Sequence, residues 1–211
     1  MKVQDNEKNR KLSKAEERRL AYFEEICGDL ARQGYRRSEL TVGIVKANKF
    51  AVIFAIPLFA LGLVLFFLLN RGRDISSFSS IVFIVSLLVL IVVHELIHGI
   101  TFAVFTKDHL KSIEFGFMKE YLTPYCTCRE PLAKGPYLCG ALMPLVILGI
   151  TPTIAAFING SLTLLLTGLV MITAAAGDIM IAINLIKYKS TASDILIFDH
   201  PTQAGTVIFE R

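Results

Sequence analysis

The sequence predicts an all-α polytopic membrane protein with four transmembrane helices. Two observations lead to this fold class. The chain of 211 residues is 54% hydrophobic, with a mean hydropathy of +0.57, which is too apolar for an ordinary soluble domain. The apolar residues also gather in four blocks, each long enough to cross a bilayer. These predicted spans 1 to 4 occupy residues 49–69, 81–105, 137–158 and 162–186.

The first 48 residues are hydrophilic and lack the pattern of a secretory signal peptide, so span 1 is expected to insert as an internal anchor. Ser13 and Glu16 have the spacing of a capping box, which predicts an amphipathic helix from Lys14 to about Gln33, lying on the membrane or on a soluble loop. Acidic residues are interleaved with its basic ones, which argues against nucleic acid as a partner. A short strand is expected at residues 39–45.

The one long connection joins spans 2 and 3, at residues 106–136. In it, the alternation of Ile113, Phe115 and Phe117 with polar or small residues predicts a small β element. Prolines inside span 3 predict a broken or bent helix. Residues 49–186 therefore form the predicted membrane domain, and residues 187–211 form an amphipathic tail.

The distribution of positive charge predicts the orientation of the chain. Four spans place both termini on one side of the membrane. Twenty of the 22 Lys and Arg residues fall on that side, and the other two lie in the short connection between spans 1 and 2. The positive-inside rule assigns the richer side to the cytoplasm, so both termini are predicted to be cytoplasmic.

Span 2 contains the pattern H-E-x-x-H, formed by His94, Glu95 and His98. On a helix the two histidines lie one turn apart on one face, a spacing that lets two imidazoles bind one metal ion. Glu95 lies beside them and could act as general base towards a water activated by the metal. An unpaired ionisable residue in hydrocarbon costs about 2.5–3.5 kcal/mol on insertion scales, so three together need a compensating partner such as a metal ion.

Asp178 in span 4 is the predicted third ligand. It is the only other ionisable residue inside the spans apart from Lys49 at the rim of span 1. Helical rise places His94 about 20 Å and Asp178 about 24 Å from the starts of their parallel spans, so they lie at similar depth. Other readings stay open at this point. Asp178 could be a capped or proton-relay carboxylate, and the third ligand could be a loop glutamate: Glu114, Glu120 or Glu130.

These features resemble the core of site-2-protease-type intramembrane metalloproteases, and more closely a bacterial family of membrane proteins described as zincin peptidases. The matching positions are 93–99, 124–126, 130–132, 177–178 and 199–201. The resemblance implies a zinc-dependent peptidase in a bacterial cytoplasmic membrane. It implies one Zn²⁺ per chain held by His94, His98 and Asp178, with Glu95 as the base.

The resulting hypothesis is an endopeptidase that cleaves membrane-protein or peptide substrates near the cytoplasmic side. Strand addition at Ile113, Phe115 and Phe117 could hold the unwound substrate, although this stretch could equally be an ordinary hairpin. His200 and Glu130 are possible accessory residues. Cys126 and Cys128 are expected to be free thiols. Two other classes remain: a non-catalytic zinc-binding membrane protein, and a small ion-coupled or proton-coupled transporter that uses the same intramembrane residues.

Overall fold

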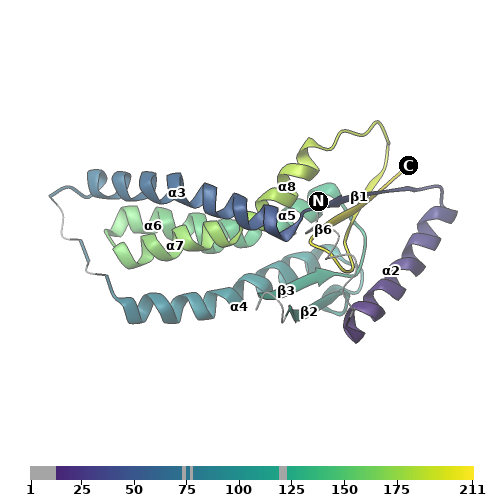
Figure 1. The fold of residues 1–211 in the computed structure, drawn as a ribbon, viewed down its shortest axis with the longest axis horizontal. Helices are drawn as coiled ribbons and strands as arrows, with labels where there is room; N and C mark the ends of the chain where they lie inside the picture. Colours follow the sequence, from purple (N-terminus) through teal and green to yellow (C-terminus); the bar gives the residue numbers. More distant parts are fainter. Residues whose placement is uncertain (1–12, 73–74, 77, 119–122) are drawn as a thin grey trace.

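Long apolar helices lie side by side in this computed structural model, and a smaller group of strands with one helix covers one end of them (Figure 1). The structure describes residues 13–72, 75–76, 78–118 and 123–211. Within these ranges the helices are α2 (Lys14–Arg32), α3 (Ile44–Leu69), α4 (Ser80–Phe105), η1 (His109–Ser112), α5 (Lys134–Pro144), the π-helical η2 (Leu145–Ile150), α6 (Thr151–Asn159), α7 (Leu162–Ala174) and α8 (Ala176–Lys187). The strands are β1 (Arg36–Thr41), β2 (Ile113–Met118), β3 (Thr123–Cys128), β4 (Leu132–Ala133), β5 (Ile195–Asp199) and β6 (Gly205–Glu210).

Three helical segments are long and apolar enough to cross a membrane. They run over Val45–Leu69, Ser80–Phe105 and Lys134–Asn159. Large apolar side chains on the first two are exposed along most of their length, and Ile53 and Ile81 have exposed fractions of 70% and 76%. Exposed apolar surface of this extent is typical of membrane contact. The fold is therefore that of a membrane protein, as the sequence predicted.

The prediction for spans 3 and 4 was partly wrong, because the sharp break lies in span 4 and not in span 3. Helices α7 and α8 meet at Ala175 with a bend of 48°, and together they would make a fourth span. Span 3 continues as one segment of 26 residues, in which η2 joins α5 to α6. The prolines of span 3 are accommodated by a local π-helical stretch, which keeps the chain helical.

A four-stranded antiparallel sheet with the order β1-β6-β5-β4 covers one end of the helices. The sequence did not predict this sheet, and the expectation of an all-α fold with only a small β element was too narrow. The tail was expected to be amphipathic, but β5 and β6 are apolar on both sides because both faces of the sheet are covered. Ile197 and Ile208 pack towards the membrane helices, whereas Phe198 and Val207 pack towards α2.

Helix α2 begins at the predicted position, with the capping box of Ser13 and Glu16 formed. Its apolar face packs on the sheet. Phe23 is fully buried there, with ring centroids 5.3 Å from Phe198 and 6.4 Å from Phe209. Because β1 pairs with β6, the segments before α3 and after α8 lie at the same end of the helices.

Strands β2 and β3 form a separate two-stranded antiparallel hairpin beside α4, which confirms the predicted β element. The hairpin lies close to the helix, since a Cβ at Gly99 would meet the Phe115 ring at 2.4 Å. We call α2, the four-stranded sheet and this hairpin the cap. The cap covers the ends of the membrane helices next to the H-E-x-x-H motif.

Phe23→Ala should destabilise the protein by about 3–5 kcal/mol, because it removes a fully buried aromatic ring from the joint between α2 and the sheet. Unfolding in detergent micelles would measure this loss. Phe117→Ala is the control, since that ring is 55% exposed. Equal stabilities of the two variants would contradict the packing of α2 on the sheet.

Candidate metal centre

The two histidines of the motif lie on one face of α4 and are both buried, with exposed fractions of 8% for His94 and 7% for His98. The helix forms because the segment is almost wholly apolar, and the Ser79 side chain caps its start by accepting from the backbone N–H of Val82. The i, i+4 spacing brings the two Nε2 atoms within 3.1 Å of each other.

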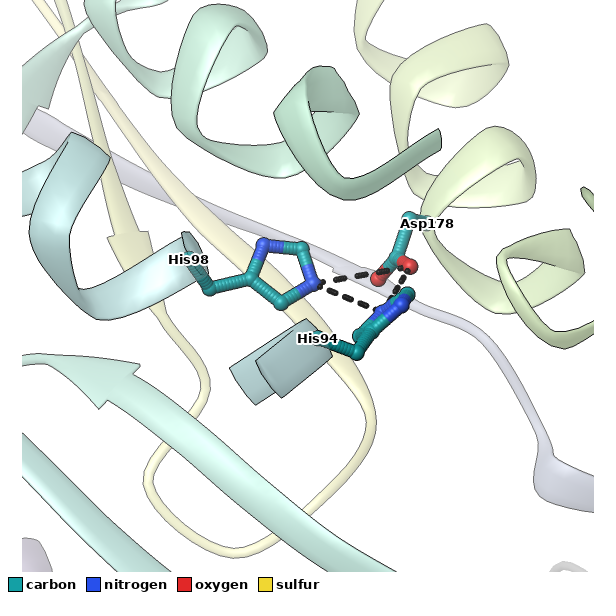
Figure 2. Close-up of side chains that lie close together, drawn as sticks. All are labelled: His94, His98 and Asp178. Carbon is teal, nitrogen blue, oxygen red and sulfur yellow. Dashed lines mark hydrogen bonds and ion pairs between the residues drawn. The ribbon is translucent and has the colours of Figure 1, made fainter. Parts of the chain in front are cut away.

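Asp178 lies in the first turn of α8, immediately after the break at Ala175. Its Oδ2 atom is 3.2 Å from Nε2 of His94 and 3.6 Å from Nε2 of His98. Figure 2 shows the three side chains pointing towards one another from two different helices. The three predicted ligands are therefore brought together, although they are separated by up to 84 positions in the sequence.

The spacing of these three atoms fits a zinc ion. Bonds of about 2.0–2.2 Å in a tetrahedral site place neighbouring ligand atoms roughly 3.3 Å apart. The three separations here run from 3.1 to 3.6 Å. Two neutral imidazoles and one carboxylate are also a donor set that zinc accepts in catalytic sites. Among the described residues, this is the group of His, Cys, Asp and Glu side chains whose geometry could hold a metal ion.

Glu95 follows the first histidine and is partly buried. Its carboxylate lies near the backbone N–H of Cys126 on β3, and Glu95 lines the same cavity as the three ligand residues. Glu95 is therefore available to exchange a proton with a molecule bound beside the metal group.

A cavity of about 310 Å³ connects the metal group with the cap. This volume is at the lower end of the range of ligand sites in proteins. The deep wall consists of side chains from α4, α5, α7 and α8, and the outer wall consists of β3, the 199–205 segment and two residues of α2. Polar, thiol and aromatic side chains in its wall include Arg19, Tyr125, Cys126, Tyr137, Asp199 and His200.

Two of the three loop glutamates that were alternatives to Asp178, Glu130 and Glu114, lie away from the histidines and make other contacts. Glu130 accepts hydrogen bonds from the backbone N–H groups of Lys107 and Asp108 and from the Ser112 hydroxyl, and so holds the chain after α4. Burial acts to raise the pKa of Glu130, but these hydrogen bonds lower it below the ordinary value. Glu114 faces Arg19 at 3.5 Å. Glu120 lies outside the described residues.

His200 and the three β2 residues predicted to hold a substrate lie away from the metal group, in the cavity wall or in the hairpin. His200 lines the cavity, and its Nδ1 accepts from the backbone N–H groups of Thr202 and Gln203 at 3.3 and 3.0 Å. Burial lowers the pKa of His200, so the ring is neutral at pH 7. Ile113, Phe115 and Phe117 lie on β2, whereas the hairpin residues that line the cavity belong to β3.

Sequence reasoning missed Asp199 and Tyr137, which meet in the cavity wall. The Tyr137 hydroxyl donates to Asp199, and the backbone N–H of Cys128 donates to the other carboxylate oxygen at 2.7 Å. Burial raises the pKa of Asp199 above its ordinary value in spite of these two donors. The sequence singles out His200 in this segment, but nothing in the sequence indicates that Asp199 reaches α5.

Arg19 was also missed, because it belongs to a helix far from the motif in sequence. Its guanidinium donates to the Pro201 carbonyl at 3.2 Å and to the Tyr125 hydroxyl, and lies 4.7 Å above the Tyr125 ring. A single side chain of α2 thus links β3 to the 199–205 segment across the mouth of the cavity.

A family model described as "Putative zincin peptidase" matches residues 87–193. The matched segment runs from the first half of α4 to the residues before β5, and contains His94, Glu95, His98 and Asp178. No curated protein and no solved structure matches the chain.

The thiols of Cys126 and Cys128 should resist alkylation. Burial and the nearby Asp199 carboxylate raise the pKa of Cys128 to about 12, and the same influences raise the pKa of Cys126. At pH 8 the reactive thiolate is then rarer than in a free thiol by about three orders of magnitude. In a Cys27→Ser, Cys139→Ser background, iodoacetamide should label the protein only above about pH 11, where the thiolate becomes populated.

A Ser193→Cys variant supplies the control for this measurement, because Ser193 is exposed at the protein surface. Labelling of Cys126 and Cys128 at pH 8 as fast as of this control would show that the cavity wall is open to solvent.

Proposed function

Because the chain belongs to the zincin peptidase family whose model covers half of it, we propose that it is a membrane-embedded zinc metallopeptidase. Its substrates on this proposal are membrane proteins or membrane-associated peptides, cleaved near the cytoplasmic side. The observation that carries the proposal is the convergence of His94, His98 and Asp178 within one buried group that opens into a cavity.

A zinc ion held by these three residues would polarise a peptide carbonyl and make an attacking water more acidic. Glu95 is placed to take the proton of that water and to pass it to the leaving amine. The apolar helices around the group keep other water away and strengthen each electrostatic interaction within it.

The hairpin is the element best placed to hold a substrate backbone. The backbone N–H of Cys128 points away from β2 towards Asp199, so this edge of β3 is not paired with β2. The same edge lies at the cavity. We propose that an unwound substrate segment adds to the hairpin here and takes the Cys128 N–H from Asp199, because strand addition satisfies the substrate backbone groups that a helix would otherwise hide. In this arrangement Ile113, Phe115 and Phe117 would support the hairpin from β2.

The chain is proposed to sit in a bacterial cytoplasmic membrane with the cap in the cytoplasm. The cap end carries most of the Lys and Arg residues, which the positive-inside rule assigns to that side. On this orientation the cavity opens towards cytoplasmic water, which supplies the second reactant of hydrolysis.

A small ion-coupled or proton-coupled transporter is the second candidate. It is favoured by the broken helix at Ala175, three residues before Asp178, and by the π-helical stretch in the preceding span. Discontinuous helices beside intramembrane ionisable residues are typical of transporters. The role of Glu95 distinguishes the two functions. A peptidase needs Glu95 as the base of hydrolysis, whereas a transporter does not need a base for hydrolysis. A non-catalytic zinc protein would need the ligands alone.

Metal analysis of the detergent-purified protein tests the proposal. Wild type should contain one Zn²⁺ per chain, Asp178→Ala should lose it, and Glu95→Gln should retain it. Hydrolysis of a mixed pool of quenched-fluorescent peptides in the same micelles should fall by at least about 100-fold in Glu95→Gln, because that variant lacks the base.

Three other results would contradict parts of the proposal. Absence of zinc from the wild type after metal-replete purification would overturn the peptidase and favour the transporter. Zinc retained in Asp178→Ala would remove Asp178 from the ligand set. Hydrolysis unchanged in Glu95→Gln would exclude the proposed base.

A further inference from the structure

The imidazole of His98 hydrogen-bonds a backbone carbonyl through Nδ1, the ring nitrogen that does not face the metal group. Its Nδ1 atom lies 2.9 Å from the carbonyl oxygen of Gly140 on the neighbouring helix α5. A carbonyl can only accept a hydrogen bond, so Nδ1 carries the proton in this contact. In the neutral imidazole Nε2 is then the unprotonated nitrogen, and Nε2 is the atom that faces His94 and Asp178. The carbonyl therefore selects the tautomer that can bind a metal ion.

The Gly140 carbonyl can take this role because of Pro144. In an α-helix the carbonyl of residue 140 accepts from the N–H of residue 144. Residue 144 is proline and has no N–H. Pro144 nevertheless keeps helical dihedral angles, with φ −61° and ψ −38°, so α5 continues through it. The sequence thus releases one carbonyl without unwinding the helix.

The absence of a side chain at Gly140 allows the helices to approach closely enough for this contact. A Cβ at Gly140 would lie 2.2 Å from Cε1 and 2.3 Å from Cδ1 of Phe102. Phe102 is only 4% exposed and packs against the rings of both His98 and Tyr137, with centroid distances of 6.1 and 5.4 Å. Phe102 cannot move aside without disturbing His98, so α5 would have to shift away from α4.

The two histidines differ in the hydrogen bonding of their Nδ1 atoms. Nδ1 of His94 is buried and has no hydrogen-bond partner within the part of the chain that the structure describes. His98 is therefore the histidine whose orientation the fold fixes, and it anchors the arrangement of the group.

We propose that Gly140 and Pro144 form a positioning pair for the metal centre, in which Pro144 frees the Gly140 carbonyl and that carbonyl fixes the tautomer and orientation of His98. The inference rests on the proposed zinc function. Partners of this kind behind a ligating histidine typically change metal affinity by about 10–100-fold when they are lost. The pair acts through His98 and does not touch the substrate.

Competition titrations of Zn²⁺ and Co²⁺ against a chelator test the proposal on the full chain in micelles. Gly140→Ala should weaken binding by roughly 10–100-fold, because α5 is pushed from α4. Pro144→Ala should weaken binding by up to about 10-fold, since its new N–H competes for the same carbonyl. The controls are Gly135→Ala, whose Cβ would meet nothing within 4 Å, and Pro152→Ala in α6 of the same span. Both controls should bind like wild type.

A rescue variant separates positioning from general damage. Phe102→Val removes the ring atoms that a methyl group at position 140 would meet, but it also removes the ring that packs on His98. The reference is therefore Phe102→Val alone, and adding Gly140→Ala to it should weaken binding by a smaller factor than Gly140→Ala does in wild type. Nitrogen-15 NMR of labelled histidine in the metal-free protein, at a pH at which the imidazole is uncharged, gives a second readout. His98, assigned by its loss in His98→Gln, should show a protonated Nδ1 in wild type and a mixture of tautomers in Pro144→Ala.

The outcomes distinguish this proposal from the proposed function. Wild type that binds neither ion overturns the metal centre, and the positioning pair with it. Wild type that binds while Gly140→Ala and Pro144→Ala bind equally well overturns the positioning pair alone. If Gly140→Ala does not fold, Pro144→Ala and the NMR tautomer decide the matter.

Discussion

The structure depends on one constraint, which is that three ionisable side chains, two buried and one half-buried, lie among apolar helices. A lone ionisable side chain in such surroundings is unfavourable by a few kcal/mol, so His94, His98 and Asp178 have to meet one another. Their meeting fixes the position of α8 relative to α4. The break at Ala175 follows from the same need, because it starts a new helix whose first turn carries Asp178 next to the histidines.

The cap is held to this group through polar contacts at the membrane helix ends. Asp199 at the end of β5 accepts from Tyr137 on α5 and from the backbone of Cys128 on β3. One carboxylate therefore joins the four-stranded sheet, the hairpin and a membrane helix within the cavity wall. The sheet itself is stable as a layer because α2 covers one face and the membrane helices cover the other.

Local patterns in the sequence were sufficient for the first three spans, the α2 capping box, the β2 strand and the three clustered residues. Span length and the i, i+4 spacing are local properties, and the depth match of His94 and Asp178 needs only helical rise. The four-stranded sheet was not predictable in the same way. Its strands are short, their alternation is hidden because both faces are buried, and β1 pairs with a strand that begins 164 positions after the end of β1.

The residues of the site that sequence reasoning missed share one property, which is that their role arises from distant contacts. Arg19 and Asp199 are ordinary surface residue types in their own segments, and only folding brings them to the cavity. The position of the break illustrates the same point. The prolines of span 3 predicted a sharp bend there, but the span stays helical through a π-helical stretch. The sharp bend lies instead at the alanine-rich junction of span 4.

Different segments of the chain form the deep and outer walls of the cavity, and this division affects how selectivity for a substrate could change. The segment that matches the family model carries the metal group and Glu95, which are the parts that the chemistry requires. Arg19 and the 199–205 segment lie outside it and form the outer wall together with β3, which lies inside it. Residues that hold a reacting group have to keep their geometry within tight limits, whereas residues at the mouth need only leave a passage of suitable shape. Changes in α2 or in the tail can therefore alter what enters the cavity while the metal group and its supporting helices keep their arrangement.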